Sequence, residues 1–273
     1  MKISIVTPSF NQGRYIEEAI LSVSTQMYSD IEHIVIDGGS TDETIGILKK
    51  YPHLKWISEP DNGQAEALNK GLKMATGDLI GWLNADDAYL RTTFKMVSEF
   101  FAQHPDVDLT YGYVYVIDEK SRVIRKRITP EFDFGMMVRL GTCYAQPTFF
   151  FRRSVLDRVG FMDATLRQAM DYDFILKVGE KLVVRKLPRF LGSFRTHSGS
   201  MSHSGVENSL GVDLSASIQR RHAGSLPRGL PRQLHKFKDA CILYWFKILG
   251  RIISIPELVS YTLKKSANRR SKA

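Results

Sequence analysis

Along the first hundred residues, short apolar runs alternate with segments whose apolar residues recur every three or four positions. The runs are typical of buried strands, and the periodic segments are typical of helices with one apolar face. Strands are predicted at residues 3–7, 32–37, 55–58 and 79–83, and helices at residues 16–23, 40–51 and 64–75. This alternation predicts an α/β fold in which helices flank a mainly parallel sheet.

The pattern is less regular in the second half of the chain. Helices are predicted near residues 91–103 and 169–179, and strands at residues 109–117, 122–128, 147–151 and 183–194, the last interrupted by Pro188. Residues 198–232 are rich in Ser, Gly and Arg and have little periodicity, which is typical of a loop or linker. We therefore expect a domain at residues 1–205, a linker at 206–232 and a tail at 233–273.

Charge is distributed unevenly along the chain. The net charge of +9 is the balance of −7 over residues 1–110, +6 over residues 111–210 and +10 over residues 211–273. In the tail, apolar residues between Leu234 and Ile252 recur at helical spacing with basic residues between them, which predicts a basic amphipathic helix. Its partner would be an anionic surface, either a membrane or the domain itself.

Cysteines and several histidines exclude some kinds of site. Cys143 and Cys241 are the only cysteines and have no CxxC spacing, which argues against a cysteine-built zinc site and suits a reducing compartment. His33, His53 and His104 lack metal-ligand spacing and are expected at the surface. The apolar start is too short for a signal peptide, and no apolar stretch reaches the roughly 18 residues of a membrane span. We expect a cytoplasmic location.

Polar side chains follow three of the predicted strands. Ser9 and Asn11 come after the first strand, Asp37 ends the second, and Asp86 with Asp87 follows the strand at 79–83. The carboxyl ends of parallel strands meet at one edge of a sheet, where ligands bind in open α/β folds. Any single acid there could instead be a turn former or helix cap, so the prediction rests on their convergence.

Missing motifs narrow the ligand chemistry. The chain has neither a G-x-G-x-x-G after its first strand nor a G-x-x-x-x-G-K-[ST], so backbone amides alone do not bind a phosphate. A divalent metal on Asp86 or Asp87 would neutralise a diphosphate, and Asp37 could accept a hydrogen bond from a nucleobase N–H. A nucleic-acid-binding role is disfavoured by the acidic first half and by the lack of a binding motif.

Four stretches resemble, in the expected order, the glycosyltransferase family 2 enzymes with the GT-A nucleotide-sugar fold. They are IVTPSFNQGRYIEEAILSV, IVIDGGSTDET, SEPDNGQAEALNKGLKMATGDLIGWLNADD, and QAMDYDFILKV with FRTHSGSMS, and together they span about residues 1–203. The best likeness is to bacterial enzymes that assemble cell-surface polysaccharides. The resemblance implies an inverting, metal-assisted transfer of a sugar from a nucleoside-diphosphate sugar to the hydroxyl of a saccharide or lipid-linked saccharide.

Carried over by position, the resemblance implies residues for donor binding, metal binding and proton abstraction. Asp171 falls where the family has its catalytic base, and Asp86, Asp87 and His197 fall where Mg or Mn is held on the donor diphosphate. The other matched residues would line the nucleotide site and donor cleft, with residues 1–108 forming the donor half and residues 109–205 the acceptor half. They are Pro8, Ser9, Asn11, Asp37, Asp61, Gly63 and Lys70.

Two departures from the family pattern leave alternatives open. Asn84 stands at the first position of the usual acid-x-acid metal motif, so either Asp86 or Asp87 could be the ligand. Met170 stands where an acidic residue usually precedes the base, so Asp173 is an alternative to Asp171. An inactive nucleotide-sugar-binding protein remains possible from sequence, whereas a sugar-nucleotide pyrophosphorylase is disfavoured by the missing G-x-G-x-R loop.

Overall fold

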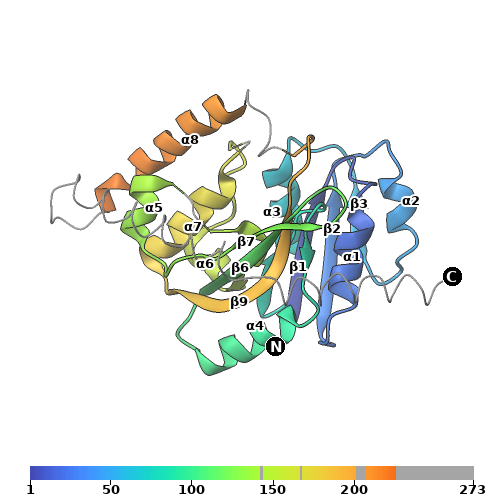
Figure 1. Cartoon of the computed structure of the whole chain (residues 1–273), viewed down its shortest axis with the longest axis horizontal. Coiled ribbons are helices and arrows are strands. Elements are labelled where there is room, and N and C mark those ends of the chain that lie inside the picture. Colours follow the sequence, from blue (N-terminus) through green and yellow to red (C-terminus); the bar gives the residue numbers. More distant parts are fainter. Residues whose placement is uncertain (142–143, 167, 201–206, 226–273) are drawn as a thin grey trace.

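A single nine-stranded sheet forms the centre of the protein, with helices on both faces (Figure 1). The computed structural model describes residues 1–141, 144–166, 168–200 and 207–225. The strand order is β3-β2-β1-β4-β8-β6-β9-β5, and β7 pairs with β6. The strands are β1 (Ile3–Ser9), β2 (Ile31–Asp37), β3 (Lys55–Ser58), β4 (Leu79–Trp82), β5 (Ala88–Tyr89), β6 (Leu109–Ile117), β7 (Val123–Arg127), β8 (Phe150–Arg152) and β9 (Val184–Arg195).

Strands β1 to β4 form the parallel half of this sheet. In β1, every residue from Ile3 to Ser9 is buried, as expected for a strand covered on both faces. Ser9 is in register with Asp37 of β2, and Val6 with Trp82 of β4. The carboxyl ends of these strands therefore meet at one edge, which confirms the convergence predicted from the sequence.

The other half of the sheet is mixed. Strand β8 runs antiparallel to both β4 and β6, whereas β9 runs parallel to β6 and antiparallel to the two-residue β5. Pro188 lies within β9, and the β6–β9 register shifts between Lys186 and Phe190. Because proline has no N–H to donate, the irregularity falls where the sequence predicted an interruption.

Helices cover the two faces of the sheet with separate apolar cores. Residues of α1 and α4 pack with Ile3, Ile5 and Phe150, whereas residues of α3, α5, α6 and α7 pack with Val6, Ile80 and Trp82. The helices of the first 205 residues are α1 (Ile16–Ser24), α2 (Thr44–Leu48), α3 (Gln64–Met74), α4 (Thr93–Gln103), α5 (Phe134–Leu140), α6 (Val155–Val159), α7 (Met170–Lys181) and the 3₁₀ helix η1 (Gln146–Thr148).

Three sequence predictions are wrong. Residues 198–232 were expected to be loop, but α8 (Glu207–His222) and the 3₁₀ helix η2 (Ala223–Ser225) occupy much of this segment. Ile218 of α8 is buried in the same core as α3 and α7, so the helix packs on the domain. The helix predicted at 40–51 is confined to α2. His33 is 3% exposed in β2, not at the surface.

The whole of the predicted tail, residues 233–273, lies outside the described residues. Residues 226–273 contain the predicted amphipathic helix, so its contact with a membrane or with the domain stays a prediction. Among the helices that the structure does describe, none combines the length and apolar character needed to cross a membrane.

Candidate functional site

The loops that follow β1 and β2 interlock at the carboxyl edge of the sheet. The backbone N–H of Asn11 donates to Ser40 Oγ at 2.7 Å, and Asn11 Oδ1 accepts from the Thr41 N–H at 2.9 Å. Asn11 has a φ of 51°, a left-handed conformation that Asn tolerates better than most residues. Ser9 Oγ is buried and has no hydrogen-bond partner among the described residues, which makes it available to a ligand.

Asp37 is fully buried and organises the loop that follows it. Its Oδ2 accepts from the Gly39 N–H, the Ser40 N–H and Ser58 Oγ at 3.1, 2.8 and 2.7 Å, and its Oδ1 accepts from Ser40 Oγ at 2.5 Å. The turn-forming interpretation of this acid is therefore correct. Because Oδ1 has a single partner, it could accept one further donor, and contact with a nucleobase stays a prediction.

Asp61, Gly63 and Lys70 lie beside this loop. Asp61 Oδ1 accepts from the Gly63 N–H at 2.8 Å, in a turn where Gly63 adopts a φ of +124° that favours glycine. A Cβ at Gly38 would lie 2.9 Å from Asp61 Oδ2, so the carboxylate faces the end of β2. Lys70, on α3, forms an ion pair with Glu59.

The three polar residues in the turn between β4 and β5 have different contacts. Asn84 Oδ1 accepts from the Trp82 indole at 2.9 Å and from the Gln64 amide at 2.7 Å. Asp86 is half-buried, and its Oδ2 lies 3.1 Å from His197 Nε2. Asp87 is 1% exposed, and its Oδ1 accepts from the Arg195 N–H at 2.8 Å. Asp86 therefore faces His197, whereas Asp87 is tied to β9.

Burial and charge both act on Asp87. Its Oδ2 is buried with no hydrogen-bond partner among the described residues. Burial raises the pKa of this carboxyl well above its usual range, and the neighbouring charge of Asp86 raises it further. Two adjacent carboxylates with an unpaired buried oxygen are an arrangement that a cation would stabilise.

Arg195 connects the acidic turn to two other elements. Its side chain donates to the Asp86 carbonyl at 2.7 Å, the Asp118 carbonyl at 3.0 Å and Glu18 Oε2 at 2.8 Å. The guanidinium also lies 4.8 Å from the centre of the Tyr15 ring, and that ring lies 4.8 Å from the His197 ring. Sequence reasoning did not single out Arg195 or Tyr15, although Arg195 is in the stretch FRTHSGSMS and lies two residues before His197.

The donor set at this turn suits an oxygen-preferring divalent metal. Mg²⁺ and Mn²⁺ use one or two carboxylates and complete their coordination with water and substrate phosphate oxygens. Among the described residues, no group of three or more His, Cys, Asp or Glu side chains is arranged to hold a metal by itself. Asp86 with His197 fits an ion that shares its coordination with a diphosphate, and the unpaired Asp87 Oδ2 lies in the same turn.

Asp171 and Asp173 have different environments in the first turn of α7. Asp171 is half-buried, and burial raises the pKa of its carboxyl, an effect that hydrogen bonds from the backbone N–H groups of Tyr172 and Asp171 and, to a smaller extent, the Arg127 charge partly oppose. Asp173 is fully buried and lies 2.7 Å from Lys177 Nζ and 3.0 Å from Arg221 Nη1. Because Asp173 is engaged by cations, Asp171 is the better candidate for a base.

A mainly parallel sheet with acids at its carboxyl edge, followed by a mixed half, is the arrangement of nucleotide-sugar-dependent transferases of the GT-A class. The sequence model named Glycosyl transferase family 2 matches residues 4–164, more than half of the chain. The protein belongs to this family, as the sequence motifs predicted.

Curated relatives are described as glycosyltransferases. A PGL/p-HBAD biosynthesis glycosyltransferase of Mycobacterium tuberculosis is 29% identical over 205 residues, which cover 72% of this chain and 77% of the relative. An uncharacterized glycosyltransferase of Nostoc sp. is 30% identical over 172 residues, or 58% of this chain. The match spans 53% of the Nostoc protein, about half its length.

Two solved structures share the fold. The S. aureus TarS fragment 1–349, in complex with UDP-GlcNAc, superposes with a TM-score of 0.67 and 21% identity over 89% of this chain and 72% of that chain. The mannosyltransferase PcManGT from Pyrobaculum calidifontis, in complex with GDP-Man and Mn²⁺, superposes with a TM-score of 0.62 and 17% identity over 97% and 79%. At these identities, the likeness establishes the GT-A fold alone.

Proposed function

We propose that the protein is an inverting glycosyltransferase that transfers a sugar from a nucleoside-diphosphate sugar to an acceptor hydroxyl. The observation that carries this proposal is the separation of two acids. Asp86 lies beside His197 at the carboxyl edge of the sheet, whereas Asp171 lies on α7, where burial raises the pKa of its carboxyl, and its neighbour Asp173 forms the ion pairs with Lys177 and Arg221. Asp86 is placed to hold a metal on the departing diphosphate, and Asp171 is placed to take the proton of the acceptor hydroxyl.

In the proposed mechanism, Asp171 accepts the proton of the acceptor hydroxyl as its oxygen attacks the anomeric carbon. The new C–O bond forms on the face opposite the breaking bond to the diphosphate oxygen, so the configuration inverts. A carboxyl whose pKa is raised toward the working pH is a stronger base than an ordinary Asp, provided that it remains ionised. A divalent metal held by Asp86 and His197 would neutralise charge on the departing diphosphate.

The donor is best identified first by binding. Thermal-shift measurements with UDP-, GDP- and dTDP-sugars, each with and without Mn²⁺, should reveal one nucleotide that stabilises the protein more strongly with metal. Support for a nucleotide sugar comes from family membership and from the UDP-GlcNAc and GDP-Man complexes of proteins with the same fold. Stabilisation by the donor without Mn²⁺-dependent hydrolysis or transfer would indicate an inactive nucleotide-sugar-binding protein instead.

Substitution of the two α7 acids tests the catalytic step. Asp171→Asn should lower the transfer or donor-hydrolysis rate by about 100-fold or more while the donor-induced thermal shift is retained, because only proton abstraction is lost. Near-full activity in folded Asp171→Asn would refute the assignment of the base. Asp86→Asn should instead weaken the Mn²⁺-dependent part of donor binding, which calorimetry with the nucleotide alone can measure.

The proposal extends to the acceptor and to the basic tail. Cell-surface polysaccharide assembly on a lipid-linked acceptor would place the enzyme at the cytoplasmic face of a membrane, and the +10 charge of residues 211–273 suits an anionic surface there. Co-sedimentation with vesicles containing anionic lipid should capture the full chain more strongly than a chain ending at Ser225. Equal capture of the two chains would defeat membrane contact by the tail.

A further inference from the structure

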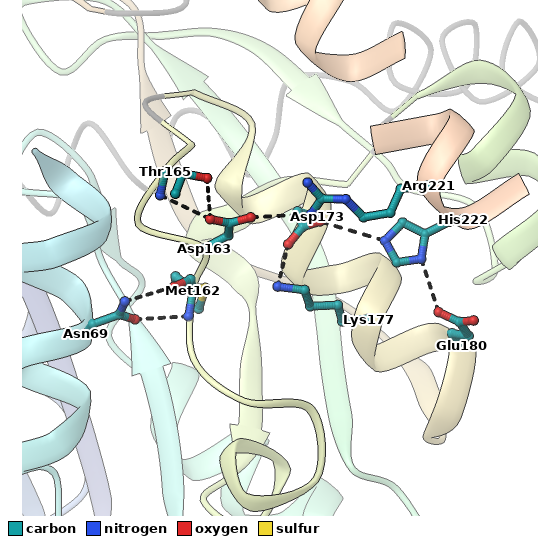
Figure 2. A network of polar contacts seen from close by, with 9 residues as sticks. All are labelled: Asn69, Met162, Asp163, Thr165, Asp173, Lys177, Glu180, Arg221 and His222. Atoms are coloured by element: carbon teal, nitrogen blue, oxygen red, sulfur yellow. Dashed lines mark hydrogen bonds and ion pairs between the residues drawn. The ribbon is translucent and has the colours of Figure 1, made fainter. Parts of the chain in front are cut away.

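The last turn of α8 is joined to the first turn of α7 through a buried carboxylate (Figure 2). Asp173 is 0% exposed, and its oxygens lie 2.7 Å from Lys177 Nζ, 3.0 Å from Arg221 Nη1 and 3.7 Å from His222 Nε2. His222 is itself buried, and its Nδ1 lies 3.1 Å from Glu180 Oε2. Two of the side chains around Asp173, those of Arg221 and His222, thus come from a helix that follows the catalytic motifs in sequence.

Arg221 also binds the loop that leads into α7. Its Nη1 lies 3.3 Å from Asp163 Oδ2, so one guanidinium nitrogen bridges Asp163 and Asp173. Asp163 Oδ1 in turn accepts from the N–H and the hydroxyl of Thr165, at 3.0 and 2.6 Å. Arg221 therefore fixes the distance between the loop and the first turn of the helix.

The same loop is held to the donor half of the domain. The Asn69 side chain donates to the Met162 carbonyl at 2.8 Å and accepts from the Met162 N–H at 2.9 Å, which ties the loop to α3 (Figure 2). Asn69 is next to Lys70 in sequence. A continuous set of contacts thus runs from α3 through the loop and Arg221 to Asp173.

One residue between these contacts, Ala169, is held in an unfavourable backbone conformation. Ala169, which precedes α7, has a φ of +57°, and a residue with a Cβ adopts this left-handed region only when its surroundings enforce it. It lies between the two acids that Arg221 bridges, Asp163 and Asp173. Asp171 lies two residues beyond Ala169, so its position depends on how this segment is held.

We propose that Arg221 is a positioning residue for Asp171 and that the last turn of α8 is part of the active site. The proposal rests on the function proposed above, in which Asp171 is the base. Removing the guanidinium leaves the buried Asp173 carboxylate with fewer cations and frees the loop at Asp163, so the segment containing Ala169 relaxes. The donor site at the carboxyl edge of β1, β2 and β4 does not contact Arg221 and is unchanged.

The test compares Arg221→Met with Arg220→Met in the full chain. Arg220 is the exposed neighbour on the same helix, so the second variant makes the same chemical change away from the bridge. Donor hydrolysis in Mn²⁺, with the nucleotide sugar that the thermal-shift measurements select, reports the chemical step with water as the acceptor. Arg221→Met should lower kcat by about 10-fold or more, since small misplacements of catalytic groups are costly, with the donor KM within about twofold. Arg220→Met should match the wild type.

Two further measurements separate positioning from folding. Arg221→Lys keeps a cation near both acids and should recover part of kcat, and it substitutes for Arg221→Met if that variant does not fold. Hydrogen–deuterium exchange should be faster in Arg221→Met than in Arg220→Met for peptides covering residues 160–176, and unchanged for peptides covering β1 and β2. This readout does not depend on activity.

The outcomes are distinct. Unchanged kcat in Arg221→Met overturns the proposal. In a folded variant, a loss of kcat that is matched by an equal loss of donor binding also overturns it, because the effect is then not confined to the position of Asp171. If the wild type neither hydrolyses nor transfers any donor, the proposed function fails first. Unaltered exchange at residues 160–176 would then overturn the positioning role independently.

Discussion

Acid should destabilise this protein through one buried histidine. His33 lies in the middle of β2, is 3% exposed, and shares a 3.0 Å hydrogen bond between its Nε2 and Thr7 Oγ1. Its Nδ1 has no hydrogen-bond partner among the described residues. Burial lowers the pKa of His33 from 6.5 to about 3, and the nearby His53 contributes to this shift. The native state therefore holds His33 neutral at pH values where the unfolded chain binds a proton.

The size of the effect follows from the two pKa values. Because the folded pKa is lowered, the unfolded state binds more protons between pH 6.5 and about 3, so stability falls as pH decreases through this window. The slope is about 1.4 kcal/mol per pH unit. At pH 5 the loss relative to pH 8 is about 2 kcal/mol, which corresponds to a fall of about 4–8 °C in the melting temperature of a domain of this size.

The assay is urea unfolding followed by circular dichroism at pH 8, 7, 6 and 5. The range stops at pH 5 because Glu32, whose pKa is lowered to about 2, stabilises the fold above its ordinary pKa and begins to lose that contribution as pH falls below about 4.5. His33→Leu removes the titrating group, whereas His53→Leu removes only the smaller of the two causes of its lowered pKa and leaves the buried imidazole in place. Other titrating groups are common to these proteins and cancel in the comparison.

The free energy of unfolding of His33→Leu should lack the pH-dependent loss due to this group between pH 8 and pH 5, whereas the wild type should lose about 2 kcal/mol through it. His53→Leu should lose somewhat less than the wild type, because the charge of His53 no longer lowers the pKa of His33. If the free energies of unfolding of the wild type and His33→Leu run parallel between pH 8 and pH 5, the reasoning about this buried imidazole is refuted. A constant offset between them would reflect only the lost hydrogen bond to Thr7 and the altered packing.

Two more substitutions, each paired with a control, test the contacts that stabilise the site and the core. Arg195→Leu should lower the free energy of unfolding by about 3–5 kcal/mol, since it removes a buried guanidinium that donates to Glu18 and to two backbone carbonyls, whereas Arg14→Leu at an exposed pair should cost under about 1 kcal/mol. Urea midpoints that match for these two variants would contradict the structural role of Arg195. Gly71→Ala places a Cβ 2.4 Å from Val6 Cγ1 and should destabilise by about 1–3 kcal/mol despite its better helix propensity. Gly46→Ala, with nothing within 4 Å, should stabilise by up to about 1 kcal/mol, and calorimetry that found both alanines stabilising would disprove the clash.

The sequence was sufficient for the parallel half of the fold because local and global signals agree there. The buried run Ile3–Ser9 and the helices beside it, each with one apolar face, specify both the elements and their order, and parallel strands then bring Ser9, Asp37 and Asp86 to one edge without further information. His33 was wrongly predicted at the surface because histidine is a polar residue type, whereas β1 and the helices that cover the sheet bury its side chain.

Other features depend on contacts that are distant in sequence. Helix α8 has few apolar residues, and what fixes it is Ile218 in the core of α3 and α7 together with Arg221 and His222 against Asp173. The different roles of Asp86 and Asp87 follow from Arg195, more than a hundred residues later in the chain. The sequence alone does not show which of two adjacent aspartates faces inward.

The acidic turn between β4 and β5 has a consequence for how specificity can change. Residues 83–87 are held at one end by the Leu83 N–H, which donates to the Val6 carbonyl at 3.1 Å, and at the other by the pairing of Ala88 with Ser193. An insertion or deletion there would move Asp86 away from His197, so the length of this turn is not free to vary. Diversification toward other sugars and acceptors should therefore concentrate in longer connections such as residues 128–133, and libraries for directed evolution should vary loop length there while leaving residues 83–87 untouched.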